Sequence, residues 1–100
     1  MINRKKLQTG EIQITFVLDD PRPTSVVGDF NGWDPYRNPL VTRSSGLRSA
    51  AVAVPEGTVL RFRYLAVGGV FFDESDADAL ENNGVGGTHS MLVAALVGEA

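Results

Sequence analysis

Glycine, proline and asparagine interrupt this 100-residue chain about every 8 to 12 residues, and the stretches between them alternate apolar with polar side chains. In residues 11–18 the apolar side chains fall on every second position, at Ile12, Ile14, Phe16 and Leu18. This two-residue period is typical of a strand with one buried face, and no stretch shows the 3.6-residue period of an amphipathic helix. The pattern predicts an all-β antiparallel sandwich.

The best-defined predicted strand covers residues 58–67. Its inward set is apolar: Leu60, Phe62, Tyr64 and Ala66. Its outward set is Arg61, Arg63 and Leu65. Because successive side chains of a strand point to opposite faces, the two arginines must lie together on the outside of the sheet. The other predicted strands are 24–30, 40–43, 47–54, 70–72 and 88–97, with a polar loop at 73–87.

The length of the chain fits one small globular domain. We expect residues 11–97 to form that domain, residues 1–10 to be a flexible N-terminal leader and residues 98–100 to be a tail. Cysteine is absent, which excludes disulfides, thiolate zinc ligands and thiol nucleophiles. The basic residues near the N-terminus are not followed by the apolar segment of a secretory signal, and no apolar run approaches the roughly 18 residues of a membrane span. These features predict a cytoplasmic protein without a membrane partner.

Charge argues against nucleic acid as a partner. The chain has 9 basic and 12 acidic side chains, a net charge of −3, and its arginines are scattered along the sequence. A domain that neutralises several phosphates normally shows a basic face.

Catalytic arrangements are poorly represented. The single histidine, His89, lies inside the last predicted strand, where a histidine usually packs or faces solvent. Asp29 and Asp34 could pair as in a glycosidase, but a small sandwich offers them no enclosed cleft. We therefore expect no enzymatic activity and no cofactor.

Acidic residues are concentrated in the polar loop: Asp73, Glu74, Asp76, Asp78 and Glu81. Calcium binds oxygen ligands at short spacing, but the glycine that a calcium loop of the EF-hand type needs at its sixth position is missing. A solvated acidic loop is the better interpretation, and no metal site is predicted.

The segment VVGDFNGWDP, residues 26–35, places a tryptophan in a loop directly after a strand. Asn31 and Gly32 form a turn dipeptide, since both tolerate positive φ. We expect Phe30, at the end of the strand, to enter the core and Trp33 to lie exposed. An exposed tryptophan in a small domain indicates binding.

The segment GDFNGW, a following Leu40, a Pro55-Glu56-Gly57 turn, and Phe62 to Leu65 ending in Gly68-Gly69 together resemble the family 48 carbohydrate-binding modules. These are the early-set domains at the N-termini of isoamylases and glycogen branching enzymes, and the glycogen-binding domain of the AMP-activated protein kinase beta subunit. The resemblance covers residues 11–94. It implies an immunoglobulin-like sandwich that binds α-1,4-linked glucans such as glycogen, starch and maltooligosaccharides.

By position, the resemblance implies a carbohydrate-binding set of Trp33, Arg63, Phe71, Val85, Thr88 and His89. Trp33 would stack on a glucose ring and Arg63 would bond its hydroxyls. Phe71 stands where the family usually has a second stacking tryptophan. Val85 and Thr88 would supply an apolar contact and a hydroxyl, and His89 replaces an asparagine.

A glucan is the partner that this resemblance implies, with a glycogen-metabolising enzyme or another protein as a further partner. A second interpretation stays open. The departures from the family pattern, at Val67, which replaces a common Asp, at Phe71 and at His89, favour an interaction or scaffolding domain that has kept the fold and lost the sugar. A buried Trp33, or an Arg63 engaged in an ion pair, would support this alternative.

Overall fold

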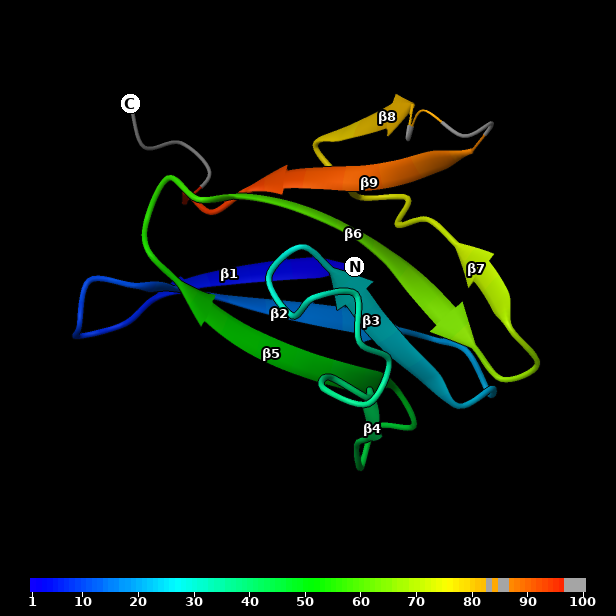
Figure 1. Cartoon of the computed structure of the whole chain (residues 1–100). Helices are drawn as coiled ribbons and strands as arrows, with labels where there is room; N and C mark the ends of the chain where they lie inside the picture. Colours follow the sequence, from blue (N-terminus) through cyan, green and yellow to red (C-terminus); the bar gives the residue numbers. More distant parts are fainter. Residues whose placement is uncertain (83, 85–86, 97–100) are drawn as a thin grey trace.

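Two antiparallel sheets face each other in the computed structural model, which describes residues 1–82, 84 and 87–96 (Figure 1). The first sheet has the strand order β1-β2-β5-β4. Its strands are β1 (Ile2–Lys6), β2 (Ile12–Leu18), β5 (Arg48–Val54) and the short β4 (Val41–Thr42). The predicted all-β, immunoglobulin-like antiparallel sandwich is confirmed.

The second sheet has the order β3-β6-β9-β8, with β7 paired to β6 outside this path. Its strands are β3 (Thr24–Gly28), β6 (Val59–Ala66), β9 (Thr88–Val93), β8 (Ala79–Asn82) and β7 (Val70–Phe72). Phe62 pairs with Ser90 of β9, whereas Tyr64 pairs with Phe72 of β7. Strands β7 and β9 therefore lie end to end along one edge of β6, and Arg63 lies where they meet.

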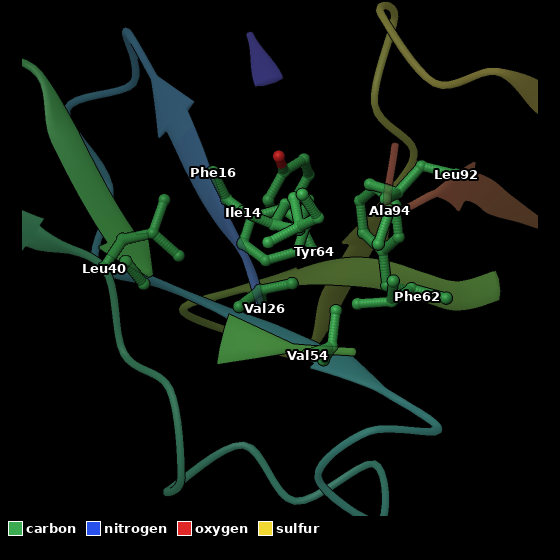
Figure 2. Packing of buried hydrophobic residues seen from close by; sticks show 12 residues of the cluster. Ile14, Phe16, Val26, Leu40, Val54, Phe62, Tyr64, Leu92 and Ala94 are labelled. Atoms are coloured by element: carbon green, nitrogen blue, oxygen red, sulfur yellow. The ribbon is translucent and has the colours of Figure 1, made fainter. Parts of the chain in front are cut away.

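The core forms where the inward faces of the two sheets meet (Figure 2). β2 and β6 contribute half of the core cluster, and three alternate residues of each strand are fully buried: Ile12, Ile14, Phe16, Leu60, Phe62 and Tyr64. The rings of Phe16 and Phe62 pack edge to face with centroids 4.9 Å apart, a favoured aromatic geometry. The alternation read from the sequence therefore identifies the core face of both strands correctly.

The N-terminal residues differ from the expected leader. Residues 2–6 form β1, which pairs in register with β2 from Ile2↔Phe16 to Lys6↔Ile12. Arg4 fixes the strand to the second sheet, since its Nε donates to the Val93 carbonyl at 3.2 Å and its guanidinium pairs with Asp78. Because β1 contains mainly polar and charged residues, its sequence shows no apolar alternation from which a strand could be predicted. The predicted tail, 98–100, lies outside the described residues.

The predicted acidic loop is also different. Residues 79–82 form β8, and Glu74 is only 4% exposed. Burial raises the pKa of Glu74, but hydrogen bonds from the Met1 ammonium, the Asp76 amide and the Tyr64 hydroxyl outweigh burial and hold that pKa below its ordinary value. Glu74 is therefore a structural carboxylate inside the fold and is not part of a solvated loop.

Two further results apply to the described residues alone. No three His, Cys, Asp or Glu side chains gather there as a metal site would require. That part of the chain also has no helix of the length and apolarity that a bilayer crossing needs.

Candidate functional site

The loop between β3 and β4 is built around the buried amide of Asn31. Its Oδ1 accepts a hydrogen bond from the Gly28 amide at 3.0 Å, and its Nδ2 donates to the Val26 carbonyl and to Asn38 Oδ1 at 3.1 and 2.8 Å. Asn31 is 8% exposed, so these bonds satisfy polar groups that water cannot reach. The loop then folds back along β3 (Figure 1), where the Val26 amide donates to the Asn38 carbonyl.

Gly28 is required at the end of β3 by close packing. A Cβ atom at this position would lie 2.5 Å from the Arg61 carbonyl oxygen and 2.6 Å from a ring carbon of Phe30. Such separations are shorter than van der Waals contact. The absence of a side chain lets the Phe30 ring fold over β3 towards the core, where it stacks on Phe16 with centroids 5.9 Å apart. Phe30 is therefore partly buried and packs against the core, in part as the sequence predicts.

The turn itself is shifted by one residue from the sequence prediction. The left-handed residues are Gly32, with φ of 68°, and Trp33, with φ of 59°. Asn31, which tolerates positive φ, is not left-handed here, and its side chain bonds the backbone of β3. A tryptophan is rarely left-handed, and the hydrogen bond from its amide to the Gly28 carbonyl, 2.8 Å long, holds it there.

Trp33 is 44% exposed. Its backbone is anchored beside Gly28, which pairs with Phe62 of β6, between the two outward arginines Arg61 and Arg63. Among the described residues, the indole forms no hydrogen bond or ring contact with Arg63 or Phe71. The loop thus holds the Trp33 backbone at the end of β3 and leaves the indole partly exposed.

Arg63 and Phe71 do come together on that outer face. The guanidinium carbon lies 4.8 Å from the centroid of the Phe71 ring, a cation–π distance. Phe71 remains 48% exposed, so one part of its ring is free. The Arg63 Nε is 3.9 Å from Asp73 Oδ1, and within the described residues this nitrogen has no hydrogen-bond partner.

Asp73 connects Arg63 to another predicted site residue, Thr88. The Thr88 hydroxyl donates to Asp73 Oδ2 at 2.6 Å, and the Ser90 hydroxyl donates to Asp73 Oδ1 at 3.2 Å. Thr88 is exposed and its oxygen can still accept a hydrogen bond. The carboxylate therefore holds the ends of β7 and β9 together next to the guanidinium.

His89 lies in β9, as the sequence predicts, one position beyond the last pair that β9 forms with β6. Its Nε2 is 2.9 Å from Glu81 Oε1, which also accepts a hydrogen bond from Arg61 Nε at 2.9 Å. Hydrogen bonds from His89 and Arg61 lower the pKa of Glu81. His89 and Arg61 are thus held by one carboxylate of β8.

Of the predicted site residues, Arg63 and Thr88 lie at Asp73, and Phe71 packs against Arg63. His89 follows Thr88 in β9 and is bound to Glu81, whereas Trp33 follows β3, on the other side of β6. Val85 lies outside the described residues. Sequence reasoning missed Asp73 and Glu81 as members of this network, because both belong to the stretch read as a solvated loop. Their signal is visible only in the strand register, which brings β8 and β9 side by side.

The chain is similar to part of a known enzyme. Over 69 residues, 66% of this chain, it is 33% identical to 1,4-alpha-glucan branching enzyme GlgB 2 from two strains of Xanthomonas campestris pv. campestris. The chain spans only 9% of the length of these enzymes. No family model matches the sequence. The similarity therefore links the chain to a small region of a glucan-processing protein.

Proposed function

We propose that this domain binds α-1,4-glucans without catalysing a reaction, through the outer face of the second sheet and the adjoining loop. The exposed indole of Trp33 carries the proposal. A pyranose ring has an apolar C–H face and a rim of hydroxyls, so its binding site needs flat aromatic surfaces flanked by a few polar groups. Trp33 and Phe71, exposed by 44% and 48%, are the aromatic surfaces that we assign to this role.

Two polar residues near Phe71 support the proposal. Arg63 lies against Phe71, and Thr88 offers an exposed oxygen next to Asp73. A guanidinium has several donors in a fixed plane, so its outer nitrogens can bond neighbouring hydroxyls while its carbon stays over the ring. The similarity to part of a glucan branching enzyme supports the same class of ligand.

The expected affinity is low. Covering roughly 80 Å² of apolar surface at each ring contributes about 2 kcal/mol. Two rings give about 4 kcal/mol, which corresponds to a Kd close to millimolar. A domain of this kind is retained well only by long glucans that present many copies of the same unit.

A second function, protein interaction through the same fold, is favoured by one specific feature. The polar groups at the β7 and β9 end are already engaged with each other, in the Arg63–Asp73 and His89–Glu81 pairs. A protein surface that has lost its sugar ligand could keep such internal pairs.

Affinity electrophoresis in gels that contain glycogen separates the two functions. We expect the wild-type chain to be retarded and Trp33→Ala to run as in a gel without glycogen. Thermal melting of both proteins checks that the variant is folded, and Val41→Ala, an exposed position on the first sheet, is the matched control that should stay retarded. An unretarded wild-type chain, or equal retardation of wild type and Trp33→Ala, contradicts glucan binding at this face.

A further inference from the structure

A groove lies where the β3–β4 loop, whose returning part pairs with β3 at Ser25 and Pro39, meets the end of β6. It measures about 560 Å³ and is lined mainly by Pro35, Tyr36 and Pro39 from the loop and by Ser25, Leu65 and Val67 from the sheet. This volume is within the range of small-molecule sites, roughly 300 to 1,000 Å³. The groove is a second concave surface, which the candidate site described above does not include.

Tyr36 stands at this groove with its side chain almost fully open to solvent, at 90% exposure. Asp34 fixes the backbone that carries it: Asp34 Oδ1 accepts a hydrogen bond from the Tyr36 amide at 2.9 Å, and the Asp34 carbonyl accepts one from the Arg37 amide at 3.3 Å. The ring is thus presented from an ordered turn, which reduces the entropy that a ligand would have to remove on binding.

The groove is continuous with the proposed glucan face. Ser25, Leu65 and Phe71 are neighbours across three adjacent strands, since Leu65 pairs with Ser25 on one side and with Phe71 on the other. Paired residues of adjacent strands share a face and lie about 5 Å apart. Leu65 therefore forms the floor between the groove and Phe71, on which Arg63 rests.

The chemistry of the groove selects a neutral ligand. Among the described residues that line it, none carries a charge, and the surface alternates apolar carbon with the hydroxyls of Ser25 and Tyr36. A charged peptide or an anion would find no partner there, whereas a sugar offers both an apolar ring face and neutral hydroxyls.

From this continuity and neutrality we propose that the groove holds further glucose units of the same glucan chain, with the Tyr36 ring as their platform. The inference rests on the proposed function and extends it: the domain selects long linear glucans over short ones. A short oligosaccharide occupies the aromatic site of Trp33 and Phe71 alone. A longer one crosses Leu65 and reaches Tyr36.

Amide NMR titrations of the full chain with maltotriose and maltoheptaose test this extension. We expect Tyr36→Ala to weaken maltoheptaose binding about thirtyfold, the size of one lost ring contact, and to change maltotriose binding by less than about twofold. Tyr36→Phe, which keeps the platform, should bind both sugars like wild type. Because Tyr36 is exposed, Tyr36→Ala should fold normally, and its spectrum verifies this.

The possible results separate the two proposals. If wild type and Tyr36→Ala bind maltoheptaose equally, the groove is not a glucan site while glucan binding stands. If the wild-type chain binds neither sugar, the proposed function fails together with the extension. A decaproline peptide serves as a competing probe, since extended proline-rich segments also dock in aromatic grooves. Shifts at Leu65 and Val67 with decaproline and none there with maltoheptaose overturn the glucan assignment of the groove.

Discussion

The two sides of the proposed glucan face are built in opposite ways. On the loop side, hydrogen bonds of the buried Asn31 amide and of the Asp34 carboxylate hold the backbone, and the rings of Trp33 and Tyr36 are left open. On the strand side, where β7 meets β9, the side chains hold each other: Arg63 lies on Phe71 and near Asp73, and Thr88 donates to Asp73. The loop is stabilised by hydrogen bonds to its backbone, whereas the strand side is stabilised by contacts between the surface side chains themselves.

This difference assigns separate contributions to the two sides. The loop side can accept a sugar without breaking any contact, so we expect it to supply most of the affinity. On the strand side a sugar hydroxyl must share donors with Asp73, and the net gain of each exchanged hydrogen bond is small, about 0.5 to 1.5 kcal/mol. We therefore expect the strand side to adjust the affinity and the loop side to decide whether binding occurs.

The largest expected effect comes from removing the internal support of the loop. Asn31→Ala leaves the Gly28 amide and the Val26 carbonyl without their side-chain partners in a buried site. Each unsatisfied group costs about 1 to 3 kcal/mol, so we expect the free energy of unfolding to fall by about 3 kcal/mol, as measured by urea denaturation.

Retention by glycogen should disappear in the same variant, because Trp33 loses its fixed position. Arg37→Ala, an exposed change in the same loop, is the control and should alter stability by no more than about 0.5 kcal/mol. If Asn31→Ala were as stable as wild type and equally retarded, the loop would not depend on this amide. The difference that we draw between the loop side and the strand side would then be wrong.

Much of the fold could be predicted from the sequence, since strand alternation is a local property. The alternating apolar positions in β2 and β6 are the positions that the core buries. β1 and β8 could not be found in this way. β1 forms because β2 has a free edge to pair with, and β8 forms because β9 does. Edge strands with charged residues receive their structure from pairing with the neighbouring strand, and their own sequence shows no apolar alternation.

The candidate site divides in the same manner. The exposure of Trp33 follows from its loop position, and the outward direction of Arg63 follows from the strand period. The ties of Arg63 to Asp73 and of His89 to Glu81 depend on strand register, which the sequence alone does not specify. The groove beside Tyr36 depends on the loop folding back along β3, a path set by the bonds of Asn31 and Asn38.

A smaller effect is expected when the strand side is given a larger ring. Phe71→Trp provides more apolar surface to a sugar and a better cation–π partner for Arg63. We expect glucan affinity to rise about threefold, measured as stronger retardation in glycogen gels, while Phe71→Ala lowers it. A change at Phe71 that equals the effect of Trp33→Ala would show that both sides contribute alike.

The smallest effect concerns the carboxylate that engages His89 and Arg61. Because their hydrogen bonds lower the pKa of Glu81 from its ordinary value of 4.5, the stability that this carboxylate contributes is present above that pH and is lost as pH falls through the lowered pKa. Glu81→Gln should therefore melt slightly below wild type at neutral pH, and the difference should shrink as the solution is acidified below 4.5.

Glu56→Gln, which alters an exposed pair with Lys6, is the matched control for a lost surface carboxylate. The retention of Glu81→Gln in glycogen gels tests the division of roles between the two sides, because the substitution frees Arg61 and His89 while every loop contact stays in place. Unchanged or slightly stronger retention fits a strand side that only adjusts affinity. A complete loss of retention would mean that the Glu81 network itself contacts the glucan, and the division of roles between loop and strands would have to be reversed.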